Sequence, residues 1–378
     1  MTAKDYLWRC PDANGISVQS FTHGKKASLG FGAMRLPDEK ETARLVDTYL
    51  ERGYNYFDTA WIYGGSEEKL RETLVKRHPR DSFLVANKLP PWEVKNHSDC
   101  DKLFAEQLRR TGLEFFDFYL VHSLSDERER EVEDMRLFEW ASEKKARGLI
   151  SHVGFSFHGT TAYLERILKA HPESEFVLLQ LNYSDILRGE AGEWQKLAIK
   201  YNQPIFVMEP VKGGSLAKLP APAEKILRDY APHRSIASWA VQYAATLQGV
   251  TCMLSGMSNM EHLRDNLQTF ANLKPLTAEE HELLEQVLVE TGKVASIPCT
   301  ACKYCHAVCP QEIDIAACFS LYNDLKRGGT DWNLAMMYKA LPQSKRANDC
   351  FNCNACNAHC PQRIDIPKGL DEVAKTFK

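Results

Sequence analysis

Short apolar runs alternate with amphipathic stretches along most of the chain. The runs are nearly continuous in apolar residues, which is typical of parallel strands covered on both faces. The stretches between them repeat their apolar residues at helical spacing, as in residues 41–53. The pattern predicts strands at residues 28–34, 54–60, 83–89, 117–123, 152–157, 176–182, 204–210 and 252–257.

The regular alternation of strands and helices indicates the fold class. Eight such units in roughly 250 residues fit a (β/α)8 TIM barrel, in which a helix follows each strand. The alternative is an open doubly wound sheet, which needs a glycine-rich G-x-G-x-x-G turn after its first strand. The first run, with GFGAMR, supplies no such turn. We therefore expect an α/β chain built on a TIM barrel.

Polar side chains stand at the carboxyl ends of the predicted strands, where the chemistry of such barrels is located. Taken singly, each has an ordinary explanation, with Asp58 as a helix cap, Lys88 as a surface lysine and His122 as a core histidine. Together with Tyr63 on the second loop, these three would converge at one mouth and form a catalytic site. The polar residues at the strand ends are Asp58, Lys88, His122, Ser156, Gln180, Asn182 and Glu209.

An Asp, a Tyr, a Lys and a His at one mouth suit the reduction of a carbonyl group, which needs a hydride on carbon and a proton on oxygen. A tyrosine has an unperturbed pKa of about 10, too high for easy proton exchange near neutrality. A nearby lysine cation favours the phenolate and lowers that pKa. We expect Asp58 to hold Lys88 charged. His122 would orient the carbonyl oxygen while Tyr63 acts as general acid, or as general base in reverse.

The composition is that of an ordinary globular protein. The chain has 378 residues, 44% of them apolar and 26% charged, with a net charge of −3. This charge indicates neither a nucleic acid nor an anionic membrane as a partner. No apolar run approaches the roughly 20 residues that span a bilayer. The N-terminal stretch MTAKDYLWRCPDANG contains no apolar signal core, so we expect a cytoplasmic protein.

Twelve cysteines are many for a chain expected in a reducing compartment, and eight of them form two matching rows near the C-terminus. In such a compartment a dense row of thiols more often binds metal than forms disulfides. Each row reads C-x2-C-x2-C-x3-C-P. Zinc is the alternative, but its sites usually use two C-x2-C pairs separated by a longer loop. The rows are Cys299, Cys302, Cys305, Cys309 and Cys350, Cys353, Cys356, Cys360, and the scattered cysteines are Cys10, Cys100, Cys252 and Cys318.

The row spacing is that of two-cluster bacterial ferredoxins, in which three cysteines of one row and the fourth of the other hold each [4Fe-4S] cluster. We therefore expect two [4Fe-4S] clusters and a helical segment between the rows, at residues 316–342. The expected ligands are Cys299, Cys302, Cys305 and Cys360 for one cluster, and Cys350, Cys353, Cys356 and Cys309 for the other.

The motifs around the polar strand ends resemble those of the aldo-keto reductases. The matching stretches are FDTAWIYGGSEEKLRETL, VANKL, DFYLVH and, near the eighth strand, LSGMSNMEHLRDNL. The resemblance implies a catalytic tetrad of Asp58, Tyr63, Lys88 and His122. The whole chain resembles the subgroup with a C-terminal ferredoxin domain. It implies a barrel domain over residues 1–290, followed by a small helical ferredoxin-like domain with two [4Fe-4S] clusters over 291–378.

The same resemblance implies a nicotinamide dinucleotide, NAD(H) or NADP(H), across the barrel mouth. Family members hold its carboxamide through a Ser-Asn pair and a Gln; Ser156 and Gln180 match, but Phe157 replaces the Asn. NADPH-preferring members place a cation after the eighth strand, where this chain has Gly256 and Met257, which favours NAD(H) or dual use. The expected cofactor-binding residues are Gly32, Ala33, Met34, Ser156, Gln180, Glu209, Pro210, Val211, Lys212, Gly213, Gly256, Met257, Ser258, His262, Asp265 and Asn266.

The chain is therefore expected to be an oxidoreductase that interconverts a carbonyl and an alcohol on a small molecule. A hydride carries two electrons, whereas a [4Fe-4S] cluster passes one at a time. Three roles for the tail stay open: relay to an external electron carrier or redox subunit, redox sensing, and structural support. The alternatives to this enzyme are a non-catalytic nucleotide-sensing or electron-transfer partner and a ferredoxin-dependent oxidoreductase without nicotinamide. The residues that would either line a substrate pocket or pack are Trp61, Trp92, His97 and Tyr183.

Overall fold

The computed structural model describes residues 28–294, 296–326 and 331–377. Cys10 and the N-terminal stretch of the sequence lie outside these residues. The chain divides into two compact units, and the expected domain boundary after residue 290 stays a prediction. Of the described residues, the first unit contains those within 28–210 and 238–276, and the second contains those within 211–237 and 277–377.

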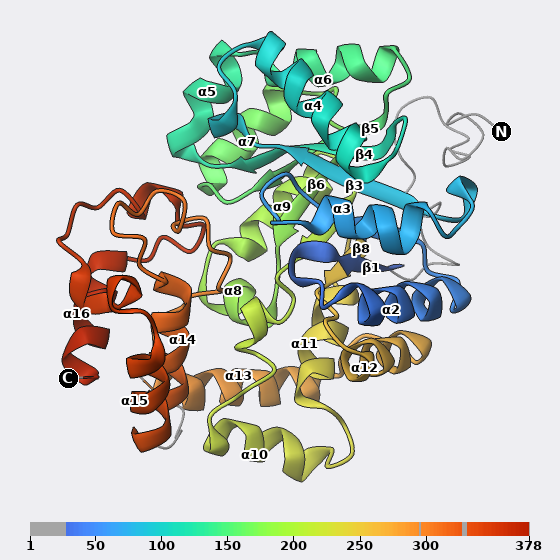
Figure 1. Cartoon of the computed structure of the whole chain (residues 1–378). Helices are drawn as coiled ribbons and strands as arrows, with labels where there is room; N and C mark the ends of the chain where they lie inside the picture. Colours follow the sequence, from blue (N-terminus) through green and yellow to red (C-terminus); the bar gives the residue numbers. More distant parts are fainter. Residues whose placement is uncertain (1–27, 295, 327–330, 378) are drawn as a thin grey trace. The chain divides into compact units, whose positions relative to one another are not determined.

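Eight parallel strands form a closed barrel, in which each strand pairs with the next along the chain and the eighth pairs with the first. In Figure 1 the strands lie inside and helices surround them. This confirms the predicted (β/α)8 barrel. The strands are β1 (Ser28–Gly32), β2 (Tyr56–Asp58), β3 (Leu84–Leu89), β4 (Phe116–Leu124), β5 (Ile150–Phe157), β6 (Phe176–Gln180), β7 (Ile205–Met208) and β8 (Val250–Ser255).

Aromatic side chains fill the inside of the barrel. The ring of Phe118 lies 5.2 Å from that of Tyr56 and 5.3 Å from that of Phe176, and the Phe176 ring lies 4.9 Å from that of Phe206. Gly154 has no room for a side chain, because a Cβ there would lie 2.6 Å from the Phe176 ring. Burying each such ring contributes roughly 1.5–3 kcal/mol. The barrel interior is therefore a packed core rather than a channel.

The helices of the first unit begin and end at residues with suitable capping chemistry. Asp38 caps α2 (Glu39–Glu51), because its Oδ1 accepts a hydrogen bond from the Glu41 N–H at 2.9 Å. Helix α4 (His97–Thr111) ends at Gly112, whose φ of 71° is the left-handed conformation that favours glycine. The other helices are α3 (Ser66–Leu70), α5 (Glu129–Asp134), α6 (Leu137–Ala146), α7 (Thr161–Ala170), α8 (Tyr183–Arg188), α9 (Ala191–Lys200), α11 (Ile236–Ala245), which begins in the second unit, and α12 (Met260–Ala271).

The sixth strand is shorter than predicted. β6 ends at Gln180, and Asn182, which was expected to end this strand, instead caps α8. Its Oδ1 accepts a hydrogen bond from the Asp185 N–H at 2.9 Å, which is a typical use of asparagine at a helix start. Its Nδ2 donates to the carbonyl of Glu209, 3.1 Å away. Asn182 thus links the chain segments that follow the sixth and seventh strands.

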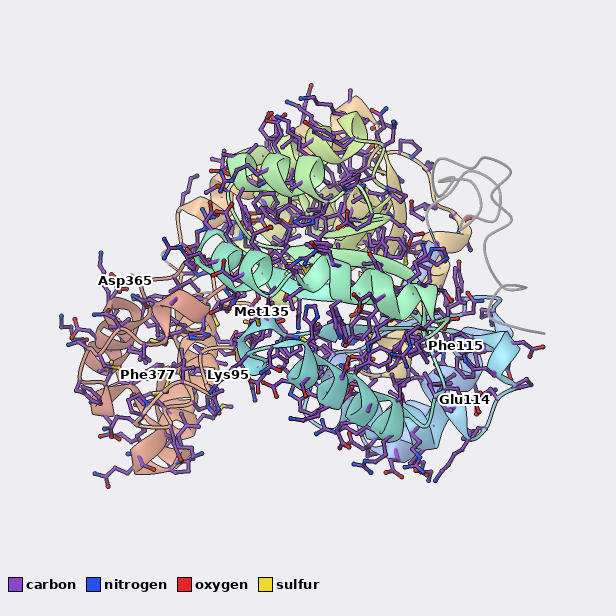
Figure 2. The ribbon with its side chains drawn as sticks, turned by 90° about the horizontal axis from the view of Figure 1, so that it is seen from above. Lys95, Glu114, Phe115, Met135, Asp365 and Phe377 are labelled. Atoms are coloured by element: carbon purple, nitrogen blue, oxygen red, sulfur yellow. The ribbon has the colours of Figure 1, made fainter. Side chains whose placement is uncertain are left out.

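An ion pair between a partly exposed arginine and a buried aspartate lies near the amino ends of β3 and β4. Arg80 Nη2 donates to Asp117 Oδ2 at 2.6 Å, and the same oxygen accepts the Val85 N–H at 2.8 Å. The Arg80 guanidinium also lies 4.2 Å from the ring centroid of Phe115, which is labelled in Figure 2. These contacts stabilise this end of the barrel, whereas chemistry is expected at the carboxyl end.

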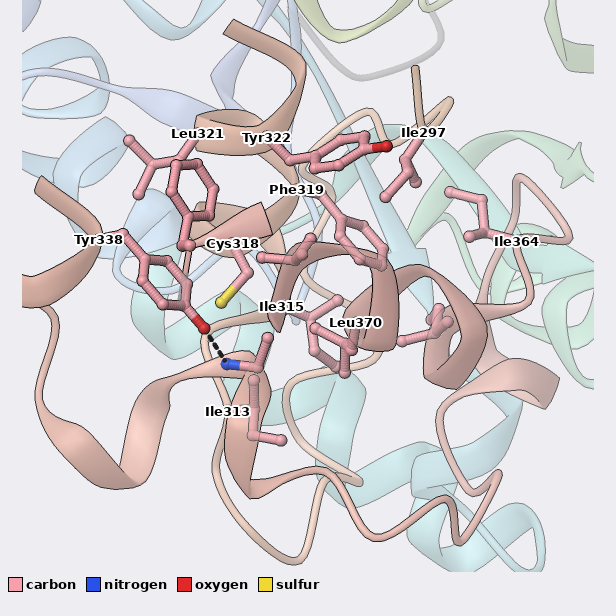
Figure 3. Packing of buried hydrophobic residues seen from close by; sticks show 14 of the residues in the cluster. Ile297, Ile313, Ile315, Cys318, Phe319, Leu321, Tyr322, Tyr338, Ile364 and Leu370 are labelled. Carbon is pink, nitrogen blue, oxygen red and sulfur yellow. Dashed lines mark hydrogen bonds between the residues drawn. The ribbon is translucent and has the colours of Figure 1, made fainter. Parts of the chain in front are cut away.

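The second unit has a hydrophobic core of its own, drawn in Figure 3. The ring of Tyr338 stacks on that of Phe377 at 4.8 Å, and its hydroxyl accepts the Ala347 N–H at 3.0 Å, the dashed bond in the figure. Cys318 and Phe319 lie in the same core and are fully buried. The helices are α10 (Ala221–Tyr230), α13 (Ala278–Gly292), α14 (Ile315–Lys326), α15 (Asp331–Ala340) and α16 (Ile366–Thr376).

Helices α14 and α15 are the helical segment expected between the two cysteine rows, of which residues 327–330 lie outside the described part. Helix α14 packs against both α15 and α16. The side chain of Asn323 on α14 bonds both polar groups of the Ile297 backbone, at 2.8 and 2.7 Å. The tail is therefore a packed helical domain with the cysteine rows at its loops. Within the described ranges, no helix combines the length and apolar character needed to cross a membrane.

Candidate active site and cysteine cavities

Three of the four expected catalytic side chains meet at the ammonium group of Lys88. Its Nζ donates to Asp58 Oδ1 at 2.6 Å and to the Tyr63 hydroxyl at 3.3 Å. A third hydrogen bond, to the carbonyl of Thr59 at 2.8 Å, accounts for the remaining ammonium proton. Asp58 is the last residue of β2 and Lys88 lies near the end of β3, so the barrel joins groups 30 positions apart in the sequence.

His122 faces the same phenol from β4. The rings of His122 and Tyr63 have centroids 6.3 Å apart and planes nearly perpendicular, at 83°. On another side the His122 ring lies 5.6 Å from that of Trp92. The Arg128 guanidinium covers the Trp92 ring at 4.4 Å and donates to the Ser123 carbonyl at 3.1 Å. Trp92 is thus held between a cation and the imidazole.

Burial governs the protonation of these groups. Lys88, Asp58 and His122 are 1%, 3% and 2% exposed. Burial lowers the pKa of Lys88 and raises the pKa of Asp58, and in each case the other partner opposes the shift. Burial, followed by the charges of Lys88, His158 and Arg128, lowers the pKa of His122 well below its ordinary value. His122 is therefore neutral near pH 7 and has one ring N–H to donate.

The two residues expected beside a nicotinamide carboxamide lie buried at strand ends. Ser156 Oγ accepts a backbone N–H of β4 at 2.7 Å, so its hydroxyl can still act as a donor. Gln180 Nε2 donates to Asp185 Oδ2 at 2.7 Å, which fixes the orientation of its amide. Phe157, which replaces the expected Asn, is fully buried and lies 5.5 Å from the ring of Trp194. Phe157 is therefore a core residue.

Further residues expected to bind the dinucleotide lie at the ends of β1 and β8 and on α12. A Cβ at Gly32 would lie 3.3 Å from the Ser255 carbonyl oxygen, so these two chain segments approach closely. Asn266 Nδ2 donates to Ser255 Oγ at 2.6 Å. Asn259 caps α12 by accepting the His262 N–H at 2.8 Å. The expected residues on these segments are Gly32, Ala33, Met34, Gly256, Met257, Ser258, His262, Asp265 and Asn266.

The loop after β7 turns sharply and passes from the first unit to the second. The expected residues on it are Glu209 and Pro210 in the first unit, and Val211, Lys212 and Gly213 in the second. Positive φ angles of 48° at Lys212 and 65° at Gly213 fold the loop back on itself. A Cβ at Gly213 would lie 2.6 Å from the Thr300 Cα. Because Thr300 follows Cys299, the expected phosphate-binding loop packs against a cysteine loop.

The eight cysteines of the two rows lie around two cavities of the second unit. Each cavity takes three cysteines from one row and the fourth from the other. The first cavity is lined by Cys299, Cys302, Cys305 and Cys360, and the second by Cys309, Cys350, Cys353 and Cys356.

Each cavity is lined by four thiols, the number of thiolates that an iron-sulfur cubane takes. Among the residues that the structure describes, no three histidine, cysteine or acidic side chains converge closely enough to hold one metal ion. A cubane instead attaches each thiolate to a separate iron corner. Burial raises the pKa of Cys305 and Cys360, and raises that of Cys356 to about 11. Metal binding at these thiols would therefore release protons.

Comparison with known proteins gives the family of the barrel. A sequence profile of the aldo/keto reductase family matches residues 28–289. The chain belongs to the aldo/keto reductase family. A profile of a 4Fe-4S dicluster domain matches residues 298–364. The protein is thus an aldo/keto reductase followed by a 4Fe-4S dicluster domain, which confirms the subgroup that the motifs resembled.

Relatives of this aldo/keto reductase support an oxidoreductase. "Uncharacterized oxidoreductase YqkF" of Bacillus subtilis (strain 168) is 26% identical over 290 residues, covering 68% of this chain and 92% of that protein. The 4-dihydromethyl-trisporate dehydrogenase of Mucor mucedo is 36% identical over 108 residues, covering 27% of this chain and 32% of that one. Among solved structures, the aldo-keto reductase AKR11C1 from Bacillus halodurans (holo form) superposes with a TM-score of 0.58 at 25% identity, covering 69% and 92% of the two chains. An aldo/keto reductase from Klebsiella pneumoniae in complex with NADP and acetate has a TM-score of 0.57 at 20% identity, covering 70% and 91%, and shows the shared fold.

The four residues expected to line a pocket or to pack have different environments in this aldo/keto reductase. Trp92 contacts the tetrad. Trp61 stacks beneath an arginine guanidinium at 3.8 Å. His97 Nε2 lies 2.7 Å from the carbonyl oxygen of Met135, which Figure 2 labels. Tyr183 is 1% exposed and packs in the core. Of the four, Trp92 is the one next to the expected reaction site.

Sequence reasoning missed several residues that support the tetrad. The Thr59 contact comes from a backbone carbonyl, for which no side chain provides a signal. Arg128 reaches the site by stacking on Trp92, a contact that depends on how the loops after β3 and β4 fold. Asn87 did carry a signal, because it is a polar residue inside the apolar run FLVANKL and precedes Lys88 directly.

Proposed function

We propose that this aldo/keto reductase interconverts a carbonyl and an alcohol by hydride transfer with a nicotinamide dinucleotide. The observation that carries the proposal is the position of Lys88 Nζ, within hydrogen-bond distance of both Asp58 and the Tyr63 hydroxyl. A buried cation beside a phenol favours the phenolate, which makes Tyr63 a competent acid and base near neutrality. The family acts on small-molecule carbonyl compounds, which agrees with this chemistry.

The tetrad divides the work of carbonyl reduction. A bound reduced nicotinamide supplies the hydride to the carbonyl carbon. Tyr63 donates its hydroxyl proton to the carbonyl oxygen, and Lys88 stabilises the phenolate that remains. Neutral His122 donates its ring N–H to the same oxygen and orients it toward Tyr63. In alcohol oxidation the Tyr63 phenolate accepts the alcohol proton instead, while Asp58 keeps Lys88 in place.

The dinucleotide would lie along the carboxyl ends of the strands. Ser156 and Gln180, which lie at strand ends of the first unit, would hold the carboxamide. Gly256 is exposed, and a Cβ there would meet nothing within 4 Å, so the backbone after β8 is open to a ligand. Met257 is 1% exposed and uncharged. The absence of a cation at these two positions supports NAD(H) or dual use over a strict preference for NADP(H).

The cysteines of the two cavities would each hold one [4Fe-4S] cluster. The crossed lining supports the pairing of two-cluster ferredoxins. Cys353 is exposed, and it is flanked by Phe351 with 57% of its surface exposed. A cluster in the second cavity would therefore be accessible to an external one-electron carrier, which supports a relay role for it. The packing of Gly213 on Thr300 supports a structural role for the first.

The test is anaerobic purification with metal analysis, titration with NADH and NADPH, and a screen of carbonyl and polyol substrates. We expect about eight iron atoms per chain, four for each cluster, and a saturable fluorescence change with a reduced dinucleotide. Tyr63→Phe should abolish turnover and leave the dinucleotide Kd unchanged. Undiminished turnover in Tyr63→Phe would refute the acid–base role. A flat titration with both dinucleotides would instead favour a ferredoxin-dependent oxidoreductase without nicotinamide.

A further inference from the structure

Behind Lys88, on the outer face of the barrel, lies a chain of buried polar side chains that the tetrad does not use. Asn87 precedes Lys88 on β3, and successive strand residues point to opposite faces, so Asn87 points outward. Glu67 of α3, Gln107 of α4 and Tyr119 of β4 complete the chain. All four side chains are at most 2% exposed. A parallel strand covered by helices normally carries apolar residues at such a position, so this group needs an explanation.

Five hydrogen bonds join these side chains to one another and to the backbone of Lys88. Asn87 Nδ2 donates to Glu67 Oε1 at 2.7 Å, and Asn87 Oδ1 accepts the Lys88 N–H at 2.9 Å. Gln107 Nε2 donates to Asn87 Oδ1 at 2.9 Å and to the Lys88 carbonyl at 3.0 Å. Tyr119 donates to Gln107 Oε1 at 2.5 Å. The backbone N–H of Lys88 is thus bonded by Asn87, and its carbonyl by Gln107.

The two amides can be satisfied in only one orientation. The Lys88 N–H can only donate, so Asn87 must present its oxygen there and its nitrogen to Glu67, and the two cannot be exchanged. The Lys88 carbonyl fixes Gln107 in the same way. Because the group is buried, each lost bond leaves a polar atom without water to replace it. The arrangement is therefore stiff.

The same network reaches the segment that carries Tyr63. The Ser66 N–H donates to the Tyr63 carbonyl at 2.8 Å, and Glu67 follows directly. Arg110 bonds Glu67 Oε2 at 3.3 Å, and its guanidinium lies 3.8 Å from the ring centroid of Trp61. Arg110 and Glu67 thus hold both ends of the short segment on which Tyr63 stands. One group of contacts sets the positions of both the phenol and the lysine.

We propose that Glu67, Asn87 and Gln107 are positioning residues that set the distance between the Lys88 ammonium and the Tyr63 hydroxyl, and thereby the rate of proton transfer. The inference rests on the proposed roles of Tyr63 and Lys88. Displacing a reacting group by about 1 Å can slow an enzyme by about 10²-fold. Loss of the network should therefore slow the proton-transfer step itself, whereas a purely stabilising network would change the amount of folded protein alone.

The test compares Asn87→Leu, Gln107→Met and Tyr119→Phe with two matched controls. Thr42→Val removes a buried hydroxyl that donates to the carbonyl of Pro37 at 3.2 Å, away from the network. Tyr49→Phe removes a buried tyrosine hydroxyl that bonds two backbone carbonyls, at 2.6 and 3.0 Å. For the full-length, cluster-loaded protein, the measurements are kcat, KM, dinucleotide Kd, the solvent deuterium isotope effect on kcat, and thermal unfolding.

We expect Asn87→Leu to lower kcat by about 10- to 100-fold, with an unchanged dinucleotide Kd and a larger solvent isotope effect. Gln107→Met should act in the same direction but less, and Tyr119→Phe least. Glu67→Gln, which keeps the acceptor for Asn87, should retain most of the kcat that Glu67→Leu loses. The two controls should lose stability but keep kcat per folded molecule and an unchanged isotope effect.

The proposal is overturned if the network variants match their controls in kcat and isotope effect after correction for folded fraction. If Asn87→Leu does not fold, the comparison of Tyr119→Phe with Tyr49→Phe, and of Gln107→Met with Thr42→Val, decides. Tyr63→Phe is measured in parallel. Turnover that survives in Tyr63→Phe would end the proposed function. Turnover lost there, with network variants that behave like the controls, would end the positioning role alone.

Discussion

The barrel mouth and the cysteine tail prepare their reactive groups in opposite ways. At the mouth, Lys88 bonds Asp58 at 2.6 Å and Tyr63 at 3.3 Å, so the protein itself supplies both partners of these contacts. In the tail, eight cysteines stand around two cavities, and no three metal-binding side chains within the described ranges converge on a single ion position. At the mouth, protein groups hold the Lys88 ammonium, whereas the tail cysteines surround cavities that a cluster would fill.

This difference predicts which property a substitution changes first in each region: catalysis and stability at the mouth, or cluster assembly in the tail. A change at Lys88 or Asp58 breaks a buried pair of opposite charges, so under the proposed function it should affect catalysis and stability together. A change at a cysteine removes one attachment point of a cluster, so it affects assembly first, because metal binding contributes directly to the folding of small domains. The following four predictions test this contrast.

The largest effect is expected from Lys88→Met. Tyr63 loses its cation, so kcat for carbonyl reduction should fall by about 10²- to 10⁴-fold. Asp58 is left buried without its partner, which should destabilise the barrel by about 3–5 kcal/mol. Adding Asp58→Asn should restore stability but not kcat, as measured by urea unfolding and steady-state kinetics. Lys102→Met, at an exposed pair with Asp99, is the control and should change neither. Equal losses in both lysine variants would contradict the prediction.

Cys309→Ser should separate the two clusters. It should remove about half of the iron, because the crossed lining places Cys309 with Cys350, Cys353 and Cys356. Alkylation with peptide mapping should then label those three thiols, while the thiols of the first cavity stay protected. Carbonyl turnover should change little. Cys360→Ser is the mirror variant and should expose the thiols of Cys299, Cys302 and Cys305. Labelling within the row that contains the substitution would mean that the pairing is not crossed.

A smaller effect is expected from Gly213→Ala, which puts a methyl group against the backbone of Thr300. The methyl group must displace the first cysteine loop, so the first cavity should retain less iron, measured by the alkylation of Cys299. Gly214→Ala is a matched control, since Gly214 also has a positive φ, 100°, but a Cβ there would meet nothing within 4 Å. Both variants share the backbone strain of roughly 1–2 kcal/mol. Equal iron loss in the two would show that strain, not the Thr300 contact, is responsible.

The smallest effect is expected on the acid side of the pH profile. Burial holds the pKa of His122 well below its ordinary value. The imidazole therefore stays neutral as the pH falls through about 6.5, the ordinary pKa of histidine. kcat/KM for carbonyl reduction should accordingly show no loss in that range. His122→Asn keeps a donor without a titrating group and should give a profile of the same shape. An acid limb near 6.5 that disappears in this variant would contradict the prediction.

The barrel and the location of its polar residues could be predicted because both follow from local sequence. Parallel strands covered on both faces read as continuous apolar runs, and the polar residue that ends each run marks the mouth. Asp58, Lys88 and His122 were found in this way. The method failed at Asn182, where a polar residue two positions past the strand caps the next helix.

Contacts between distant segments could not be predicted from one sequence. The bond from Asn87 to Glu67 joins side chains 20 positions apart, and the bond from Gln107 to Asn87 joins another pair 20 positions apart. Neither pair has a spacing that distinguishes it from chance. The packing of Gly213 on Thr300 could not be predicted either, because a glycine in a loop usually indicates a turn and not a close contact with another segment.

The contact between Gly213 and Thr300 affects how a truncated protein that ends at residue 290 can be interpreted. A shortened chain that ends at residue 290 would keep Gly213 but lose Thr300, the residue against which it packs. The loop after β7 would then lack this packing partner and could adopt another conformation. Weak dinucleotide binding by such a truncated protein would say nothing about whether electrons pass through the clusters. Cysteine-to-serine substitutions that empty one cavity at a time keep the whole polypeptide. They test whether electrons pass through the clusters while Thr300 stays in place beside Gly213.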